Sequence, residues 1–308
     1  MPESPWTVAE PQKLAFDEPV TALHVRSVNG TVNVVGVEEG PARLEVTELD
    51  GPPLTVSLED GVLTVAYDDL PWKGFLIGKW LDRKGHGRSA VISLAVPAAA
   101  AVEVGVVGAA AMVSGIEGPT TVRGVTGDTT LVGTSGQIQA ETVSGALEAQ
   151  AVGGELSFKS VTGDLTVIEG AGPSVRAESV SGNMILDLDP TGSTDVRLTT
   201  VSGEIAIRLA QPTDAQIEAS TATGAVSNGF DDLRIGGTWG AKRITGQLGT
   251  GAGRLRATTI SGSVALLLRP PLDDVDEAAA AKGENDRYAD EAPGRAAPEG
   301  DAPTGKVL

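Results

Sequence analysis

Cysteine is absent from the 308-residue chain, and only 3% of its residues are aromatic. The lack of cysteine excludes a disulfide scaffold, a thiolate zinc site, an iron–sulfur cluster and a cysteine nucleophile. The two histidines are too few for a histidine-rich metal site. Since 41% of the residues are hydrophobic, the chain can still bury a core, and we expect that core to consist of aliphatic side chains.

Basic residues are scarce as well: 23 Lys and Arg oppose 41 Asp and Glu, which gives a formal net charge of −18. Nucleic-acid binding is therefore not expected, because phosphate neutralisation needs clustered basic residues. Residues 1–19 lack the segments of a signal peptide, and the most apolar stretch, residues 91–113, is interrupted by Pro97 and Glu103. We expect a cytoplasmic protein, with export or surface association by an unrecognised route as the alternative.

Glycine, by contrast, is abundant, with 40 residues. Much of it ends a recurring tetrapeptide of the form Ser/Thr–apolar–Ser/Thr–Gly, whose copies from residue 145 to residue 246 are 18 to 22 residues apart. We interpret these glycines as structural turns that adopt a left-handed or otherwise strained backbone. The predicted turn positions are Gly127, Gly145, Gly163, Gly182, Gly203, Gly224, Gly246 and Gly262.

Between the glycines, apolar and polar residues alternate, as in Ile205, Ile207 and Leu209. This period of two is typical of a strand with one buried face. A short strand followed by a turn can bury that face only by stacking on its neighbours. The pattern predicts an all-β fold over residues 91–270, a β-solenoid or parallel β-helix-like stack of 18–22-residue coils in serial order. An antiparallel β-sandwich is the competing fold.

Composition predicts three regions. Residues 1–19 are interpreted as an N-terminal arm, and residues 20–270 as a single β-repeat (solenoid) domain with a basic aromatic insertion at 71–90. The domain begins with a looser β-sheet region at residues 20–67, where short alternating runs are separated by Gly-Pro and Asp-Gly turns. Residues 271–308 are acidic, rich in Ala and Pro and without periodicity, which predicts a disordered tail.

The segment SVNGTV at residues 27–32, and the segment VISLAVP at residues 91–97 with the SVSG-type repeats that follow it, resemble a known family. It is a bacterial family of β-strand-repeat domains of unknown function, catalogued as putative adhesins. The resemblance covers about residues 20–270. It implies a fold similar to single-stranded β-helices, no catalytic residues, and the export or anchoring that the adhesin label usually accompanies.

No nucleophile elbow, Walker loop, dinucleotide fingerprint or calcium-binding glycine repeat is present in the sequence. We therefore expect no enzyme, no cofactor and no bound metal. Outward carboxylates at Asp187, Asp189 and Asp195 leave a carbohydrate-active β-helix as an alternative. The paired hydroxyls of the tetrapeptide, such as Thr200 and Ser202, would line up in two ladders on one face, with the apolar residue between them opposite. Such ladders either bond the backbone at the turns or bind carbohydrate.

Residues 71–88 stand out because they combine aromatic and basic side chains in an acidic chain. They form either a cap over the end of the stack or a contact with a partner or a membrane surface. The candidate contact residues are Trp72, Lys73, Phe75, Lys79, Trp80, Arg83, Lys84 and Arg88. The sequence favours a non-catalytic scaffold or interaction module whose partner is another protein. A carbohydrate-binding or carbohydrate-active β-helix and peripheral membrane attachment through residues 72–88 are the alternatives.

Overall fold

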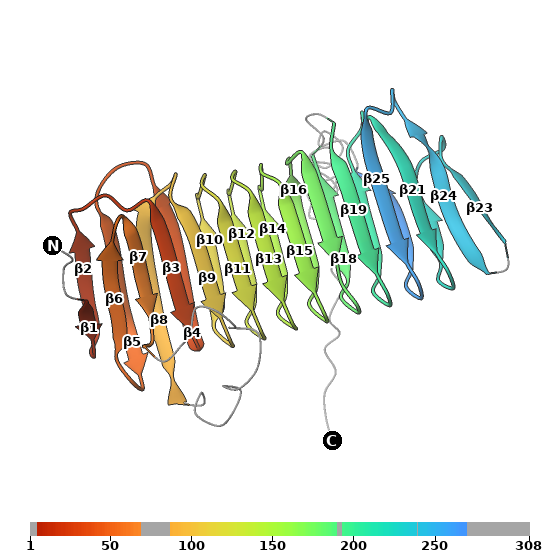
Figure 1. Cartoon of the computed structure of the whole chain (residues 1–308). Coiled ribbons are helices and arrows are strands. Elements are labelled where there is room, and N and C mark those ends of the chain that lie inside the picture. Colours follow the sequence, from red (N-terminus) through yellow and green to blue (C-terminus); the bar gives the residue numbers. More distant parts are fainter. Residues whose placement is uncertain (1–4, 69–86, 190–192, 239, 270–308) are drawn as a thin grey trace, which may run out of the picture. The chain divides into compact units, whose positions relative to one another are not determined.

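The computed structural model of the protein describes residues 5–68, 87–189, 193–238 and 240–269. These residues form 26 β-strands, arranged in two large mixed sheets without an α-helix among them (Figure 1). The all-β prediction is thus confirmed. Every described residue belongs to one compact unit, Met1–Arg269. The predicted disordered tail lies outside the described residues.

The first sheet has 14 strands. In spatial order they are β1 (Trp6–Val8), β6 (Leu54–Glu59), β7 (Val62–Ala66), β3 (Ala22–Ser27), β9 (Ala101–Val106), β11 (Thr120–Gly124), β13 (Ile138–Thr142), β15 (Leu156–Ser160), β17 (Ser174–Glu178), β19 (Asp195–Thr200), β25 (Gly253–Thr259), β21 (Ala215–Thr221), β24 (Ala241–Leu248) and β23 (Arg234–Thr238).

The second sheet has 12 strands. In spatial order they are β2 (Gln12–Phe16), β5 (Ala42–Asp50), β8 (Ser89–Pro97), β4 (Asn29–Val37), β10 (Ala110–Ser114), β12 (Thr129–Val132), β14 (Leu147–Gln150), β16 (Leu165–Gly170), β18 (Met184–Leu188), β20 (Ile205–Leu209), β26 (Val264–Leu268) and β22 (Val226–Asn228).

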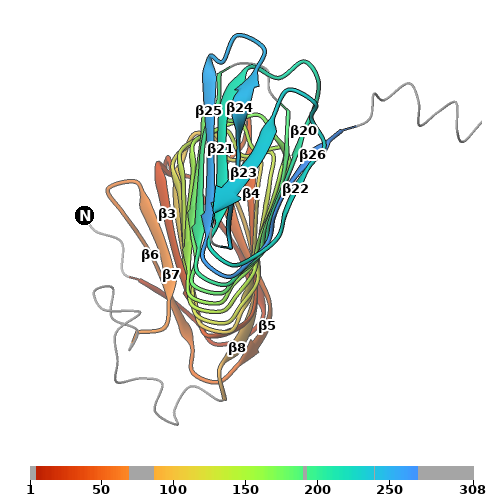
Figure 2. The ribbon, with the colours of Figure 1, turned by 90° about the vertical axis from the view of Figure 1, so that its right-hand side faces the viewer.

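From β9 to β20 the chain alternates between the two sheets, and each strand pairs in parallel with the strand two places further along the chain. One repeat of the sequence therefore adds one strand to each sheet. The register keeps equivalent residues together, so that Leu147, Leu165, Met184 and Ile205 are successive partners. Figure 2 shows these repeats one behind another, with the two sheets facing each other across the core.

The core consists of stacked inward-facing side chains from the two sheets. Most of them are aliphatic, as expected, but Phe158 is also buried at 1% exposure. Its register partners in β13 and β17 are Ala140 and Ala177, and these two small side chains leave room for the ring. The expectation of a purely aliphatic core is therefore wrong at this position, because large and small residues alternate along the stack.

The order of the last repeats differs from the order of the sequence. Strand β25 lies between β19 and β21, and β26 lies between β20 and β22. The repeat that ends at Gly262 is thus inserted between those that end at Gly203 and Gly224. The predicted serial order is wrong here, because each tetrapeptide segment presents the same apolar alternation and the same corner to a neighbour.

Gly246 is not at a turn. It lies inside β24, where it is the register partner of Ile217 in β21, and this pairing is antiparallel. Strand β23 adds to β24 as an antiparallel hairpin. The prediction of a turn at Gly246 is wrong because the motif that contains it forms part of a strand, and the first sheet ends here in the hairpin instead of a further repeat.

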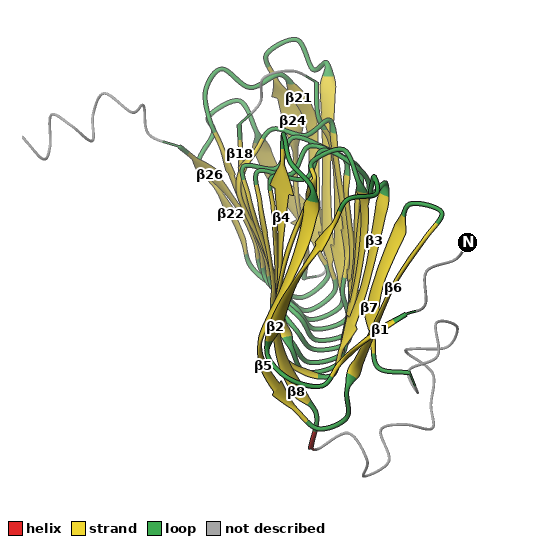
Figure 3. Cartoon of the chain, turned by 90° about the vertical axis from the view of Figure 1, so that its left-hand side faces the viewer, coloured by secondary structure: helices red, strands yellow, loops and turns green. Residues whose placement is uncertain are grey.

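At the N-terminal end, residues 5–19 do not form a separate arm. Strand β1 pairs antiparallel with β6, and β2 pairs antiparallel with β5 (Figure 3). The side chains of Val8 and Phe16 are buried in the common core. These strands therefore belong to the two sheets, as do the strands of residues 20–67. No described segment forms a helix long and apolar enough to cross a membrane.

Candidate interaction surface

The tetrapeptides form the corners where the chain passes from the first sheet to the second, and their hydroxyls bond the backbone. The backbone N–H of Gly203 donates to Thr200 Oγ1 at 3.1 Å. Ser202 Oγ donates to the carbonyl oxygen of Val180 in the neighbouring repeat at 3.4 Å. Thr200 is buried and Ser202 is exposed, so the two hydroxyls do not share one face. The expected pair of open ladders is wrong, because the chain bends within the motif.

The corner glycines are required by close backbone contacts between repeats. A Cβ atom on Gly145 would lie 2.1 Å from the carbonyl oxygen of Gly127, and one on Gly262 would lie 1.8 Å from that of Gly203. None of the eight predicted turn glycines has a positive φ. We predicted a left-handed or otherwise strained backbone for them, and the left-handed alternative is therefore wrong. Glycine is needed because neighbouring corners leave no space for a side chain.

The apolar residue at the centre of the tetrapeptide points outward at successive corners. The exposed residues in this line of side chains are Val143, Val161, Val180, Val201 and Ile260. Each lies next to the exposed hydroxyl of the third position of the motif. The line is only one side chain wide. Scattered exposed aliphatic residues of this kind are ordinary on protein surfaces.

Of the three aspartates of the carbohydrate-active alternative, Asp187 lies in β18 and Asp189 directly follows that strand, whereas Asp195 lies in the other sheet. Asp187 lies on β18 in the second sheet, where its carboxylate pairs with Arg269 Nε at 2.9 Å and with Arg208 Nη1 at 3.5 Å. Asp195 begins β19 in the other sheet and is 3.8 Å from Arg176 Nη2. Asp187 is thus neutralised by two arginines. The arrangement does not place Asp187 and Asp195 side by side for acid–base chemistry.

The candidate contact residues from Trp72 to Lys84 lie outside the described residues. Arg88, the last of them, is described and half-buried. Its guanidinium carbon is 5.5 Å from the centre of the Tyr67 ring, and its carbonyl oxygen accepts a hydrogen bond from Asn29 Nδ2 at 3.0 Å. The structure therefore gives Arg88 a packing role at the N-terminal end of the second sheet.

Charges of both signs meet on the outer face of the first sheet near β3, β9, β11 and β13. Glu103 pairs with Arg123 Nη1 at 2.5 Å and lies 4.0 Å from His24 Nε2. Glu141 lies 3.6 Å from Arg123 Nε. Burial lowers the pKa of His24 below its ordinary value of 6.5, against the opposing effect of Glu103, and burial lowers the pKa of Arg26 to about 10. On this half of the face, positive and negative charges therefore balance each other locally.

The other half of the same outer face, over β17, β19, β25, β21, β24 and β23, is rich in arginine. The outward-facing arginines, which we call the arginine face, are Arg176, Arg197, Arg234, Arg243, Arg254 and Arg256. Within these strands, the acidic residues on the same surface are Glu178, Asp195 and Glu218. Six arginines against three acidic residues make a positive surface in a chain whose net charge is −18.

Three of these arginines stand in one row across adjacent strands. Arg176 in β17 is the register partner of Arg197 in β19, which is the partner of Arg256 in β25. Neighbouring strands are about 4.8 Å apart. Arg256 pairs with Glu218, the next residue of the row in β21, whereas Arg197 pairs with no acidic side chain among the described residues. Since exposed ion pairs are weak, Arg176 and Arg256 can exchange their acidic partners for a ligand, and Arg197 has no such partner to lose among the described residues.

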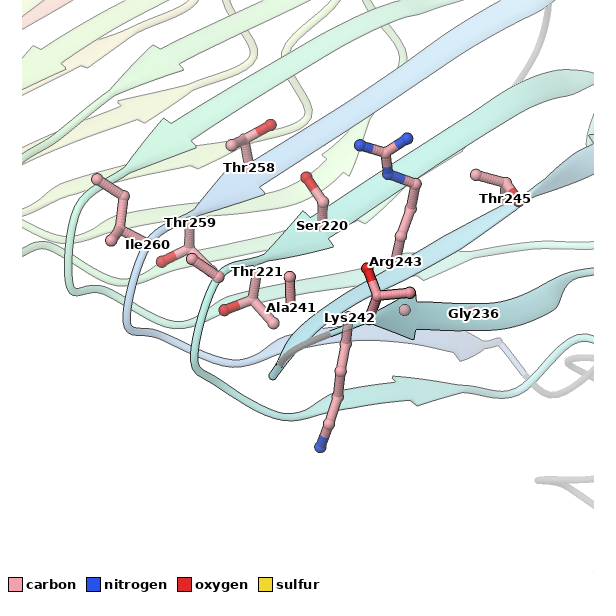
Figure 4. Close-up of a pocket in the computed structure, with 13 residues that line it drawn as sticks. Ser220, Thr221, Gly236, Ala241, Lys242, Arg243, Thr245, Thr258, Thr259 and Ile260 are labelled. Carbon is pink, nitrogen blue, oxygen red and sulfur yellow. The ribbon is translucent and has the colours of Figure 1, made fainter.

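A hollow of about 590 Å³ adjoins the row, over β21, β23, β24 and β25. Figure 4 shows Ser220, Thr245, Thr258 and Arg243 pointing to the same side of the sheet, while Lys242 points to the opposite side. Guanidinium N–H groups donate to carboxylates and other oxyanions, and hydroxyls both donate and accept. This surface can therefore bind a ligand that carries negative charge and hydroxyl groups.

The sequence reasoning missed the arginine face. Arg197 and Arg256 are 59 positions apart in the chain, and they become neighbours only because β25 is inserted beside β19. A signal was nevertheless present: in RLTT at residues 197–200 and RATT at residues 256–259, an arginine stands two positions before the outward-facing threonine. Aligning the repeats on their glycines would have placed these arginines in one column.

No protein-family model matches the chain, and neither does any curated protein. Solved structures to which it is similar include a putative cell adhesion protein from Clostridium sporogenes, at 12% identity over 84% of this chain and 100% of that one, with a TM-score of 0.25. A putative lipid binding protein from Parabacteroides distasonis matches at 11% identity over 85% and 98%, with a TM-score of 0.42. A putative adhesin from the same organism matches at 14% identity over 84% and 96%, with a TM-score of 0.37.

Proposed function

We propose that the protein is a non-catalytic interaction module, a β-solenoid that presents the arginine face to a ligand. The observation that carries the proposal is the arginine face itself, with six exposed arginines on neighbouring strands of the first sheet in a chain of net charge −18. A locally positive surface on an acidic molecule attracts anionic partners and orients them on approach. The stacked repeats hold the surface in place, because the strands beneath it are paired in register.

The interpretation as a solenoid is supported by the parallel pairing of successive repeats. It is also supported by the close approach of neighbouring corners, such as that between Gly203 and the carbonyl oxygen of Gly182. A rigid stack suits binding better than catalysis here, since the corner hydroxyls are used by the backbone and Asp187 is held by two arginines. We keep the expectation that the protein is not an enzyme and has no cofactor.

The test compares three forms of the full chain as immobilised bait for extracts of the native host, both soluble and envelope fractions. The face variant replaces Arg176, Arg197 and Arg256 by Gln. The control variant replaces Lys13, Arg43 and Arg208, three exposed bases on the second sheet, also by Gln. Both variants lose three positive charges, so a difference between them reports the position of the charges. We expect at least one component that the wild type and the control variant retain and the face variant loses; identical recovery by all three would refute the proposal.

A further inference from the structure

We infer that the arginine face binds a polyuronate, an acidic polysaccharide with one carboxylate on each sugar unit. The inference rests on the proposed function and names the ligand class of the same surface. It is carried by the row of guanidinium groups and the neighbouring row of hydroxyls, which together complement a polymer that bears carboxylates and hydroxyls. The polymer would run across the strands, along the row of Arg176, Arg197 and Arg256.

The spacing of the row fits this ligand. Arg176, Arg197 and Arg256 occupy three adjacent strands in register, so that one guanidinium is presented about every 4.8 Å. This separation is close to the length of one pyranose unit in an extended chain. Carboxylates on neighbouring sugar units of an extended chain point to different sides, so those on the side that faces the sheet can each meet a guanidinium of the row in the planar two-bond arrangement that arginine favours.

A second row, of hydroxyls, runs beside the first. Thr199 in β19, Thr258 in β25 and Ser220 in β21 are register partners. Thr199 and Thr258 lie two positions further along the same strands that carry Arg197 and Arg256, about 6.7 Å away. Strands β19 and β25 thus each offer one cation and one hydroxyl. A uronate unit offers the complement, one carboxylate and neighbouring sugar hydroxyls.

This pairing of groups separates a polyuronate from other polyanions. A polyphosphate can only accept hydrogen bonds from the second row, whereas sugar hydroxyls both donate and accept there, and a neutral glycan has no charge for the arginine row. Single-stranded nucleic acid is bound by proteins that add stacking rings to their basic groove, and none of the outward-facing residues of the described strands β17, β19, β21, β23, β24 and β25 is aromatic. The observations therefore favour the acidic polysaccharide.

The row ends at Glu218, which follows Arg256 in register and pairs with it. A carboxylate of the polymer would be repelled there. The inference thus makes an opposite prediction for two neighbours in one row: removing an arginine weakens binding, whereas Glu218→Gln strengthens it. It also requires the exported or surface-associated location that the sequence left as an alternative, since such polymers lie outside the cytoplasm.

The experiment measures binding of full-length protein to polygalacturonate by calorimetry at low and at physiological salt. Dextran, inorganic polyphosphate and a single-stranded oligonucleotide serve as comparison ligands. We expect salt-sensitive binding of polygalacturonate, weaker by about tenfold or more in the face variant because several charge-assisted hydrogen bonds are lost. The affinity of the control variant for polygalacturonate is expected to lie within about twofold of that of the wild type. The affinity of Glu218→Gln is expected to be higher than that of the wild type.

Thermal unfolding of each variant checks that the fold is intact, and the replaced residues of the face and control variants are all exposed. Absence of polygalacturonate binding at low salt overturns the inference. Equal weakening in the face and control variants, or tighter binding of polyphosphate or the oligonucleotide, also overturns it. If the host extract yields a face-dependent component while polygalacturonate does not bind, only the ligand class fails; if neither occurs, the proposed function fails as well.

Discussion

A Cβ atom on Gly203 would lie 1.8 Å from the carbonyl oxygen of Gly182 in the neighbouring repeat. The same contact recurs between Gly182 and Gly163 at 1.9 Å and between Gly224 and Gly262 at 1.9 Å. Because the obstructing atoms belong to the backbone of the next corner, they cannot move aside without shifting a strand. The column of glycines thus fixes how closely the repeats approach.

Replacing Gly203 by Ala should therefore destabilise the protein strongly. The new methyl group overlaps the backbone of Gly182, and overpacking of this kind costs about 3 kcal/mol. Urea denaturation followed by circular dichroism measures the loss. Gly236→Ala in β23 is the matched control, since a Cβ there meets no atom within 4 Å and its φ is not positive. A Gly203→Ala protein as stable as the control would show that the corners can separate freely.

Thr200→Val removes one corner hydroxyl while keeping the shape of the side chain. Thr200 is 1% exposed, and its Oγ1 accepts the backbone N–H of Gly203. Leaving that buried donor without a partner should lower the free energy of unfolding by about 2 kcal/mol. Ser202→Ala, two positions along the same corner, should change it by less than about 0.5 kcal/mol, because Ser202 is exposed and water can replace its contact. Equal losses in the free energy of unfolding for the two variants would contradict the role of the Thr200 hydroxyl as the partner of the Gly203 N–H.

Most of the strands can be predicted from the sequence because their alternation is local. Ile205, Ile207 and Leu209 face the core as the period of two requires, and so do Met184 and Leu186. The order of the last repeats cannot be predicted in this way. Thr221 and Thr259 begin equivalent corners, so either segment can stand beside the repeat of Gly203, and only contacts between whole strands decide which one does.

The interaction surface could be predicted even less. Arg176, Arg197 and Arg256 look like isolated outward charges in three separate strands of the sequence, and strand order alone makes them a row. Likewise, the spacing of the corner glycines is the same whether glycine is needed for a left-handed backbone or for a close approach. The distinction requires the position of the neighbouring repeat, which is a long-range property of the fold.

Acidification should destabilise the protein partly through His24. Burial lowers the pKa of His24 in the folded protein below 6.5, so the unfolded chain takes up a proton at a higher pH than the folded chain does. The stabilising contribution is therefore complete above pH 6.5 and is lost as the pH falls through the lowered pKa. The free energy of unfolding of His24→Gln should fall less steeply than that of the wild type between about pH 7.5 and pH 5. Parallel curves would show that His24 does not titrate differently in the two states.

The inserted position of β25 can be tested by disulfide formation, for which a chain without cysteine is well suited. Thr199 and Thr258 are register partners on adjacent strands, as are Thr258 and Ser220, at about 4.8 Å, within the range that a disulfide spans. Thr199 and Ser220 have β25 between them and are about twice as far apart, too far for a disulfide. Replacing each pair by cysteine and oxidising the monomer should therefore give a disulfide for 199/258 and for 258/220 and none for 199/220, as counted by thiol titration and mass spectrometry. The reverse result, with only the 199/220 pair oxidised, would restore the serial order and would remove Arg256 from the row.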